Sequence, residues 1–134
     1  MREKIRNLIT AIIDNESSSD LAEHTIAFVY NALGRLLDYS RIVVEQGIET
    51  DINQALWNSG NLDGDELKRR TTEKDSERTN IHNIVIQSCR QLNRLCKKYG
   101  VENICPATDD RYEIAVFVGQ FIQELFQDGI GGSY

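Results

Sequence analysis

The stretch that decides the fold is residues 81–100, IHNIVIQSCRQLNRLCKKYG. Small or apolar residues recur in it at spacings of four, three, four, three and four, the heptad-like spacing of a helix with one buried seam. Gly100 follows the last seam position and is typical of a helix end. The sequence therefore predicts a long helix that begins near Thr72 or Asp75 and ends at Tyr99. Its seam consists of Ile81, Val85, Ser88, Leu92, Leu95 and Tyr99.

Capping pairs predict two further long helices, one on either side of this stretch. Glu23 follows Asp20 by three residues, and Glu113 follows Asp110 at the same spacing. In such a pair the first side chain accepts a hydrogen bond from the free amides of the first turn, while the second reaches back. We therefore expect helices to begin at Asp20 and at Asp110.

Apolar periodicity sets the extents of the remaining helices. Residues 2–14 form an amphipathic helix, the second helix ends at Gly47, and a short helix follows over residues 51–59. The polar stretch 65–80, in which the charges nearly cancel, is either a solvated helix or a mobile connector. No segment alternates with period two for long enough to predict a strand. We predict an all-α, single-domain bundle of four main helices plus one short helix, with a flexible tail at residues 129–134.

The composition fits a globular domain with long uninterrupted helices. Of 134 residues, 40% are hydrophobic and 27% are charged, and a single one is proline, Pro106. Fifteen basic and 21 acidic residues give a net charge of −6. This balance argues against nucleic acid as a partner, because nucleic-acid affinity depends on a basic face that neutralises phosphates. Segment 81–101 is basic and segment 102–134 is acidic, so we expect these two segments to pack as neighbours.

The N-terminal residues and the cysteines indicate a cytoplasmic protein without a membrane anchor. Charges interrupt residues 1–6 too often for a signal peptide, and no apolar run approaches the ~20 residues that span a bilayer. Three cysteines, an odd number, argue for free thiols. On one helix Cys89 and Cys96 lie about two turns apart, too far for a disulfide, whereas Cys96 and Cys105 can meet across a turn.

The motifs of several common enzyme classes do not occur in the sequence. There is no phosphate-binding or dinucleotide-binding glycine motif, and there is no Gly-x-Ser-x-Gly nucleophile elbow. There is no Glu-x-x-His pair for a dimetal bundle. Two histidines and three scattered cysteines do not offer the four ligands of a zinc site. We therefore predict no cofactor and no metal.

Polar residues beside the seam form the candidate site. Arg78 and His82 lie one turn apart on the seam helix, and histidine is the side chain best suited to acid–base chemistry near neutral pH. Arg111 lies in the first turn of the last helix, where its charge opposes the helix dipole and indicates a nearby carboxylate or anionic ligand. Two interpretations stay open: a structural network at the rim of the core, and an anion-binding pocket.

Three runs of the second half carry a family resemblance: Arg78-x-x-x-His82-Asn83, Leu92-Asn93-Arg94-Leu95-Cys96-x-Lys98-Tyr99-Gly100 and Asp110-Arg111-x-Glu113-Ile114-Ala115-x-Phe117. These runs cover about residues 78–126 and resemble a family of small uncharacterised bacterial and phage-associated helical proteins. The resemblance implies no particular activity. It implies that a set of polar signature residues forms either a buried network that fixes the register of two neighbouring helices or a ligand site. These residues are Arg78, His82, Asn93, Arg94, Asp110, Arg111 and Glu113.

The sequence favours a non-enzymatic interaction or regulatory module with an unknown protein partner. A homodimer through the second or the last helix is one arrangement, because the last helix is apolar on two adjacent stripes and must bury a wide face. A first alternative is a small-molecule or phosphate-handling enzyme, with Arg78, His82 and Arg111 around an anionic ligand. A second alternative is weak nucleic-acid association through Lys68–Arg70 together with the basic residues of 90–98.

Overall fold

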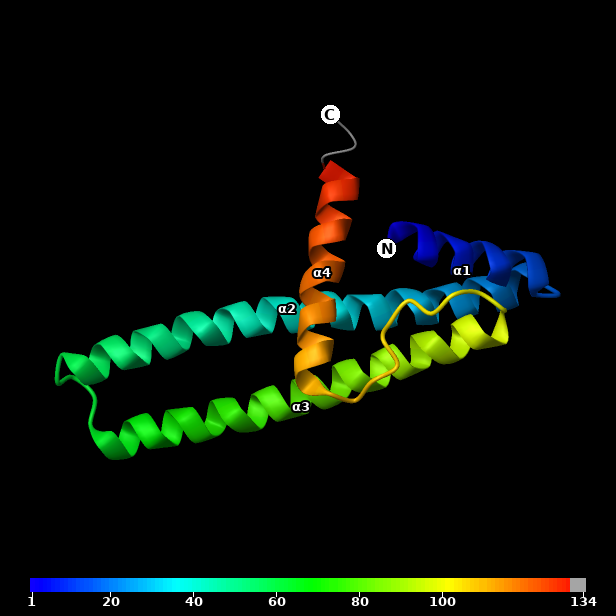
Figure 1. Cartoon of the computed structure of the whole chain (residues 1–134). Coiled ribbons are helices and arrows are strands. Elements are labelled where there is room, and N and C mark those ends of the chain that lie inside the picture. The colour runs from blue at the N-terminus through cyan, green and yellow to red at the C-terminus, as the bar shows by residue number, and fades with distance from the viewer. Residues whose placement is uncertain (131–134) are drawn as a thin grey trace.

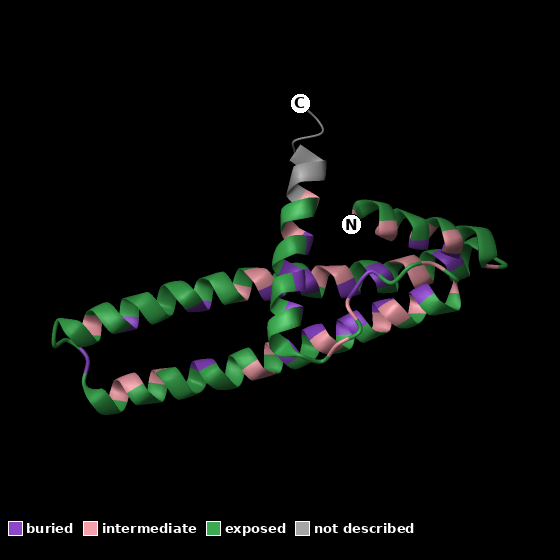
Figure 2. Ribbon diagram, in the orientation of Figure 1, coloured by how far each residue is buried: buried purple, intermediate pink, exposed green. Residues whose placement is uncertain are grey.

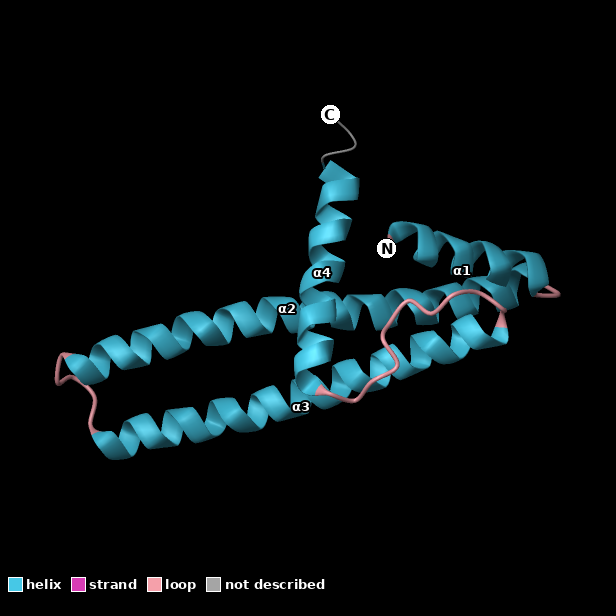
Figure 3. Cartoon of the chain, viewed as in Figure 1, coloured by secondary structure: helices cyan, strands magenta, loops and turns pink. Residues whose placement is uncertain are grey.

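The computed structural model describes residues 1–130, with side chains as far as Leu125, and this part of the chain is all-α and forms a single domain. Four helices follow one another without any strand among the described residues (Figure 3). They are α1 (Arg2–Asn15), α2 (Ser19–Asn58), α3 (Gly64–Lys98) and α4 (Arg111–Ile130). The predicted all-α fold is therefore confirmed, with four helices in place of five.

Helices α2 and α3 form a long antiparallel hairpin that has two different halves (Figure 1). In one half, α1 and α4 cover the hairpin, and α4 runs across it rather than along it (Figure 1). In the other half, α2 and α3 pack against each other, and no other element of the described part of the chain covers them. We call this second half, residues 40–80, the arm, and the remaining described residues the head. Figure 2 shows that most residues of the arm are exposed.

The main cluster of the hydrophobic core lies in the head, and the buried Leu62 at the tip of the arm lies outside this cluster. Its members come from all four helices and from the loop between α3 and α4, and none lies between residues 40 and 80. Burying each of the larger side chains contributes roughly 1.5–3 kcal/mol to folding, so the head supplies most of the apolar stabilisation. The fully buried side chains of the core include Leu8, Ile12, Val29, Leu36, Leu92, Ile114 and Phe121.

The predicted end of the second helix at Gly47 is wrong, because α2 continues through Gly47 to Asn58 and absorbs the predicted short helix. A glycine inside a helix costs only about 0.5–1 kcal/mol relative to alanine. Side-chain contacts between α2 and α3 on both sides of Gly47 outweigh that cost. The N-cap also differs from the prediction, because Ser18, not Asp20, accepts the hydrogen bond from the amide of Leu21.

Helix α3 begins earlier than predicted, at Gly64, so residues 65–80 are helical and not a mobile connector. The carboxylate of Asp63 caps the helix by accepting a hydrogen bond from the amide of Glu66 at 2.8 Å. Along the first turns Arg69 pairs with Glu66 and with Glu73, which are three and four residues away. A side-chain cap and charge pairs on adjacent turns stabilise a helix that has few apolar residues.

The end of α3 and the start of α4 agree with the sequence predictions. Gly100 adopts a left-handed conformation with φ 68° after the C-cap residue Tyr99. Asp110 caps α4 by accepting a hydrogen bond from the amide of Glu113 at 2.9 Å. The predicted tail at residues 129–134 is wrong at its start, because Gly129 and Ile130 belong to the last turn of α4, and residues 131–134 lie outside the described residues.

The basic and the acidic segment do pack against each other, but the described residues form one ion pair between them, Arg90 with Asp109. The acidic residues of the C-terminal region reach the N-terminal helix instead. The terminal amine of Met1 lies 3.2 Å from Glu124, and the ammonium group of Lys4 lies 3.4 Å from Glu102. The crossing orientation of α4 causes this difference, because it brings α4 against α1 and α2 as well as α3.

Candidate functional site

The seven predicted signature residues do not form one site. Arg78, His82 and Arg111 gather where α2, α3 and α4 meet. Asn93 and Arg94 line a pocket between α3 and the following loop. The last two, Asp110 and Glu113, lie at the start of α4, where Asp110 is the cap.

His82 lies at the border between the head and the arm, and its side chain is buried with 8% of its surface exposed. The hydroxyl of Tyr39 on α2 lies 3.2 Å from Nδ1 of the imidazole. The two rings are 5.1 Å apart and meet edge to face. Arg78 is directed to another partner, since its Nε donates a hydrogen bond to the side-chain oxygen of Gln46 at 3.2 Å. These contacts join α2 to α3 with side chains that satisfy one another.

The electrostatics of this junction favour uncharged side chains at its centre. The pKa of His82 is lowered, first by burial and then by the positive charges of Arg111 and Arg78. The pKa of Tyr39 is raised, mainly by burial. A neutral histidine held by a neutral tyrosine is typical of a structural polar contact. None of the three predicted residues, Arg78, His82 and Arg111, lines either of the two pockets described below.

Asn93 anchors the loop 101–110 to α3. Its amide nitrogen donates to the backbone oxygen of Cys105 at 3.0 Å, and its amide oxygen accepts from the backbone nitrogen of the same residue at 3.1 Å. One side chain therefore satisfies both polar groups of a buried backbone unit. The sequence identified Asn93 as a signature residue, and the structure assigns it this anchoring contact.

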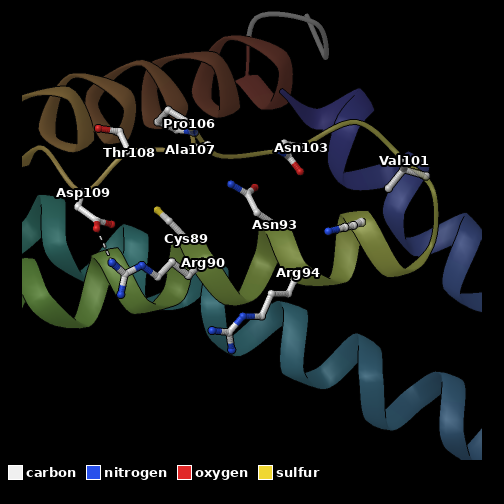
Figure 4. Close-up of a pocket in the computed structure, with 11 residues that line it drawn as sticks. Cys89, Arg90, Asn93, Arg94, Val101, Asn103, Pro106, Ala107, Thr108 and Asp109 are labelled. Carbon is white, nitrogen blue, oxygen red and sulfur yellow. Dashed lines mark hydrogen bonds and ion pairs between the residues drawn. The ribbon is translucent and has the colours of Figure 1, made fainter.

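The anchored loop and α3 enclose a pocket of about 590 Å³, which we call the basic pocket (Figure 4). Arg90, Arg94 and Lys97 on α3 line it, and Asp109 on the loop pairs with Arg90. Arg94 and Lys97 form no ion pair within the described part of the chain, so the pocket carries excess positive charge. The other lining residues are Cys89, Asn93, Val101, Asn103, Pro106, Ala107 and Thr108.

Three free and buried thiols lie where the loop meets α3: Cys89 and Cys96 on the helix, and Cys105 on the loop. Cys105 interacts directly with Cys89, and this contact together with burial raises the pKa of Cys105. The same contact lowers the pKa of Cys89, because the thiol of Cys105 stabilises the Cys89 thiolate. The sequence had suggested that Cys96 and Cys105 meet, and the charge of Cys96 does act on Cys105. The sequence missed Cys89, because the path of an irregular loop over a helix leaves no periodic signal in it.

A second pocket, of about 620 Å³, lies between the loop and the outer side of α4. Glu113 lines it, together with Met1, Lys4, Phe117 and Glu124. Two positive groups and two carboxylates share this pocket, and the amine of Met1 is paired with Glu124. The pocket is therefore nearly balanced in charge.

The outward side of α2 exposes an apolar row, which we call the outer stripe: Tyr30, Leu37, Val44, Ile48 and Ile52. Spacings of seven, seven, four and four residues place these side chains on one face of the helix. From Val44 onward more than half of each side chain is exposed, at 59%, 56% and 53% in turn. The sequence did not indicate this stripe, because the helix was predicted to end at Gly47.

The inward side of the arm is polar, and we call its contacts the polar ladder. Gln46 contacts Glu77 as well as Arg78, Lys74 contacts Thr50 and Glu49, and Arg70 donates to Asn53 at 2.8 Å. Gln46, Asn53 and Lys74 are buried. In this part of the molecule the usual distribution is inverted, with polar side chains between the helices and apolar side chains on the solvent side.

Two other kinds of feature are absent from the described residues, a metal-binding cluster and a membrane span. No group of three or more histidine, cysteine, aspartate or glutamate side chains is arranged to hold a metal ion there. None of the helices in residues 1–130 is both long and apolar enough to cross a membrane.

Comparison with known proteins gives a family and no activity. No curated protein and no solved structure matches the chain. One family model matches residues 1–129, well beyond the segment of about 78–126 in which the sequence resemblance was found. That family is described as "Protein of unknown function (DUF3232)", so a small uncharacterised family is confirmed, whereas a bacterial or phage origin stays a prediction. The match covers both the head and the arm, and the chain therefore belongs to the DUF3232 family.

Proposed function

We propose that this protein is a non-enzymatic interaction module whose arm binds an amphipathic helix of a protein partner. The observation that carries the proposal is the inverted polarity of the arm. Its polar ladder lies between α2 and α3, while Val44, Ile48 and Ile52 face solvent on the outer stripe. Exposed apolar rows of this kind mark surfaces that a partner covers.

The shape of the surface favours a helix as the occupant. The outer stripe runs along one straight helix with apolar side chains every seven or four residues, which is the spacing that a facing helix matches. A partner helix laid along the outer stripe would form a layer of three helices, with α2 between the partner and α3. Each covered side chain would then lose its contact with water, which is the main favourable contribution to such association.

The charge beside the stripe favours a basic partner. Residues 37–52 contain four acids and one base, and although Glu45 is paired with Arg41 and Glu49 with Lys74, Asp38 and Asp51 form no ion pair in the described part of the chain. Two copies of this surface would place acids against acids, whereas a helix with lysines or arginines beside its apolar row would be attracted. The last helix also gives less reason for a homodimer than the sequence suggested, because Ile114, Phe117, Val118 and Phe121 are buried within the chain.

Binding of a designed helical peptide tests the proposal. The probe is an amphipathic peptide with leucines along one face and lysines beside them, and its binding is followed by fluorescence anisotropy. We expect the double variant Val44→Glu/Ile48→Glu to weaken binding at least tenfold, equivalent to about 1.4 kcal/mol. The matched control is Thr72→Glu/Ser76→Glu, which adds the same charges at the same spacing on an exposed face of α3 and should bind like the parent chain.

The outcomes that contradict the proposal are distinct. Equal binding by the stripe variant and the control variant would remove the outer stripe as the docking face. Equal binding of a second peptide with glutamates in place of the lysines would remove the charge argument. A light-scattering mass of twice 15.3 kDa for the parent chain, restored to 15.3 kDa by Val44→Glu/Ile48→Glu, would assign the stripe to a second copy.

The alternatives from the sequence have weaker support in the geometry. An enzyme built on Arg78, His82 and Arg111 needs an open cleft, and His82 is buried against Tyr39 instead. Nucleic-acid association needs the basic residues on one uncompensated face, and Arg69 is paired with acids of its own helix. We also infer a cytoplasmic location, which fits three free thiols.

A further inference from the structure

We propose that Cys89 and Cys105 form a redox-active dithiol, and that the basic pocket admits a carboxylate-bearing low-molecular-weight disulfide that oxidises it. The ligand class is a small anionic disulfide, and oxidised glutathione is the probe. The proposal concerns the head of the molecule and does not depend on the function proposed for the arm.

The position of Cys105 is fixed by the anchor described above. Both backbone polar groups of Cys105 are bonded to Asn93, which lies on α3 one turn after Cys89. Residues four apart on a helix are neighbours on its surface, so a backbone held over Asn93 lies beside Cys89. Figure 4 shows the sulfur of Cys89 pointing from α3 toward the loop at Pro106 and Ala107.

The reagent would reach the dithiol through the basic pocket. Cys89 lines this pocket, although the residue as a whole is only 2% exposed. Arg94 and Lys97 lie in the same pocket without an acidic partner in the described part of the chain. The excess positive charge of this pocket favours anionic reagents, because it attracts them toward the thiol that lines the pocket.

The chemistry consists of two thiol–disulfide exchanges. The Cys89 thiolate attacks one sulfur of oxidised glutathione, which forms a mixed disulfide at Cys89 and releases one glutathione thiolate. The Cys105 thiolate then attacks the Cys89 sulfur, which forms the Cys89–Cys105 disulfide and releases the second glutathione. The protein dithiol loses two electrons and two protons, and one oxidised glutathione becomes two reduced molecules.

Cys96 is the internal control for this assignment. It is fully buried, and it does not line the basic pocket. It also lies two turns from Cys89 along α3, so the two sulfur atoms are about 10 Å apart, beyond the reach of a disulfide. A reaction that depends on the pocket should therefore use Cys89 and Cys105 and leave Cys96 as a thiol.

Mass spectrometry of the intact chain tests the pairing. With oxidised glutathione we expect the parent chain and Cys96→Ser to lose two hydrogens, and peptide mapping to find the Cys89–Cys105 bond. We expect Cys105→Ser to stop at the mixed disulfide on Cys89, one glutathione heavier than the reduced chain. A bond to Cys96 in the parent chain, or no reaction while the helical circular dichroism is unchanged, would overturn the proposal.

The rate of oxidation tests the role of the pocket. We expect Arg94→Glu/Lys97→Glu to slow the reaction with oxidised glutathione about tenfold, the lower end of electrostatic rate effects. The same variant should react at the parent rate with bis(2-hydroxyethyl) disulfide, which carries no charge. The control Arg69→Glu/Lys68→Glu reverses two charges on the arm and should leave both rates unchanged. If the pocket variant changed the rate by the same factor with both disulfides, relative to the parent chain, the charge-selective site would be overturned.

Discussion

Asn93 is the residue on which the loop 101–110 depends. Its side chain makes two hydrogen bonds to Cys105, and both backbone groups of Cys105 would lose their partner without it. We expect Asn93→Ala to lower the free energy of unfolding by about 2 kcal/mol, since each unsatisfied buried polar group costs about 1–3 kcal/mol. Urea unfolding measures this loss. The exposed neighbour Arg94 is the control, and Arg94→Ala should change the value by less than about 0.5 kcal/mol.

His82 should make stability depend on pH in the weakly acidic range. Its pKa in the folded chain is below its ordinary value of 6.5, because burial and the charges of Arg111 and Arg78 disfavour the imidazolium ion, while Tyr39 faces it from α2. The unfolded chain therefore binds the proton first. The contribution of His82 is fully present above pH 6.5 and is lost as the pH falls from 6.5 through the lowered pKa.

Thermal unfolding between pH 7.5 and 5 measures this effect. The parent chain should lose stability more steeply over that range than His82→Gln, which keeps a hydrogen-bonding group beside Tyr39 but does not titrate. The exposed His24 provides the matched control, and His24→Gln should follow the parent chain. A parent curve that is parallel to that of His82→Gln would show that His82 is not the titrating group.

At the scale of elements, α2 shows where a glycine does and does not end a helix. Gly47 and Gly60 have the same chemistry, but Gly60 adopts φ 79° after the helix end, while Gly47 lies in the helix with no atom within 4 Å of an added Cβ. We expect Gly47→Ala to raise the free energy of unfolding by about 0.5–1 kcal/mol. Gly60→Ala should lower it, because alanine is strained at positive φ. Urea unfolding followed by circular dichroism distinguishes these opposite signs.

The same element shows how far the sequence could predict the fold and the candidate sites. The cap at Asp110 has a local pattern and is confirmed. The seam of α3 also has a local pattern: Val85, Ser88 and Leu92 are buried, and its other three members are half-buried against the core. The continuation of α2 past Gly47 depends on contacts with α3 that are distant in sequence, so a local pattern could not show it. The basic pocket was missed for the same reason, since it exists only because Asn93 holds a loop without periodicity over α3.

At the scale of the whole molecule, the head and the arm are stabilised by different forces. The head contains the whole apolar core cluster, whereas in the arm the polar ladder holds α2 and α3 together. The net contribution of each contact of the ladder to stability is only about 0.5–1.5 kcal/mol. Regions with few buried apolar contacts open without global unfolding. We therefore expect amides of the arm near Asn53 and Lys74 to exchange with solvent at least about tenfold faster than amides near Leu92.

Replacing one hydrogen-bonded pair of the polar ladder with apolar side chains tests whether the polar interior of the arm causes its faster hydrogen exchange. The double variant Asn53→Leu/Arg70→Leu removes the 2.8 Å hydrogen bond together with both of its partners, so no buried group is left unsatisfied. Exchange of buried polar pairs for apolar ones is often neutral or stabilising. We expect this variant to slow hydrogen exchange in the arm and leave exchange near Leu92 unchanged. If the arm still exchanges at the parent rate, its length, and not its polar interior, sets its opening. Slower exchange would instead show that the chain gives up stability in the arm to keep its apolar side chains on the outer stripe, where a partner helix can reach them.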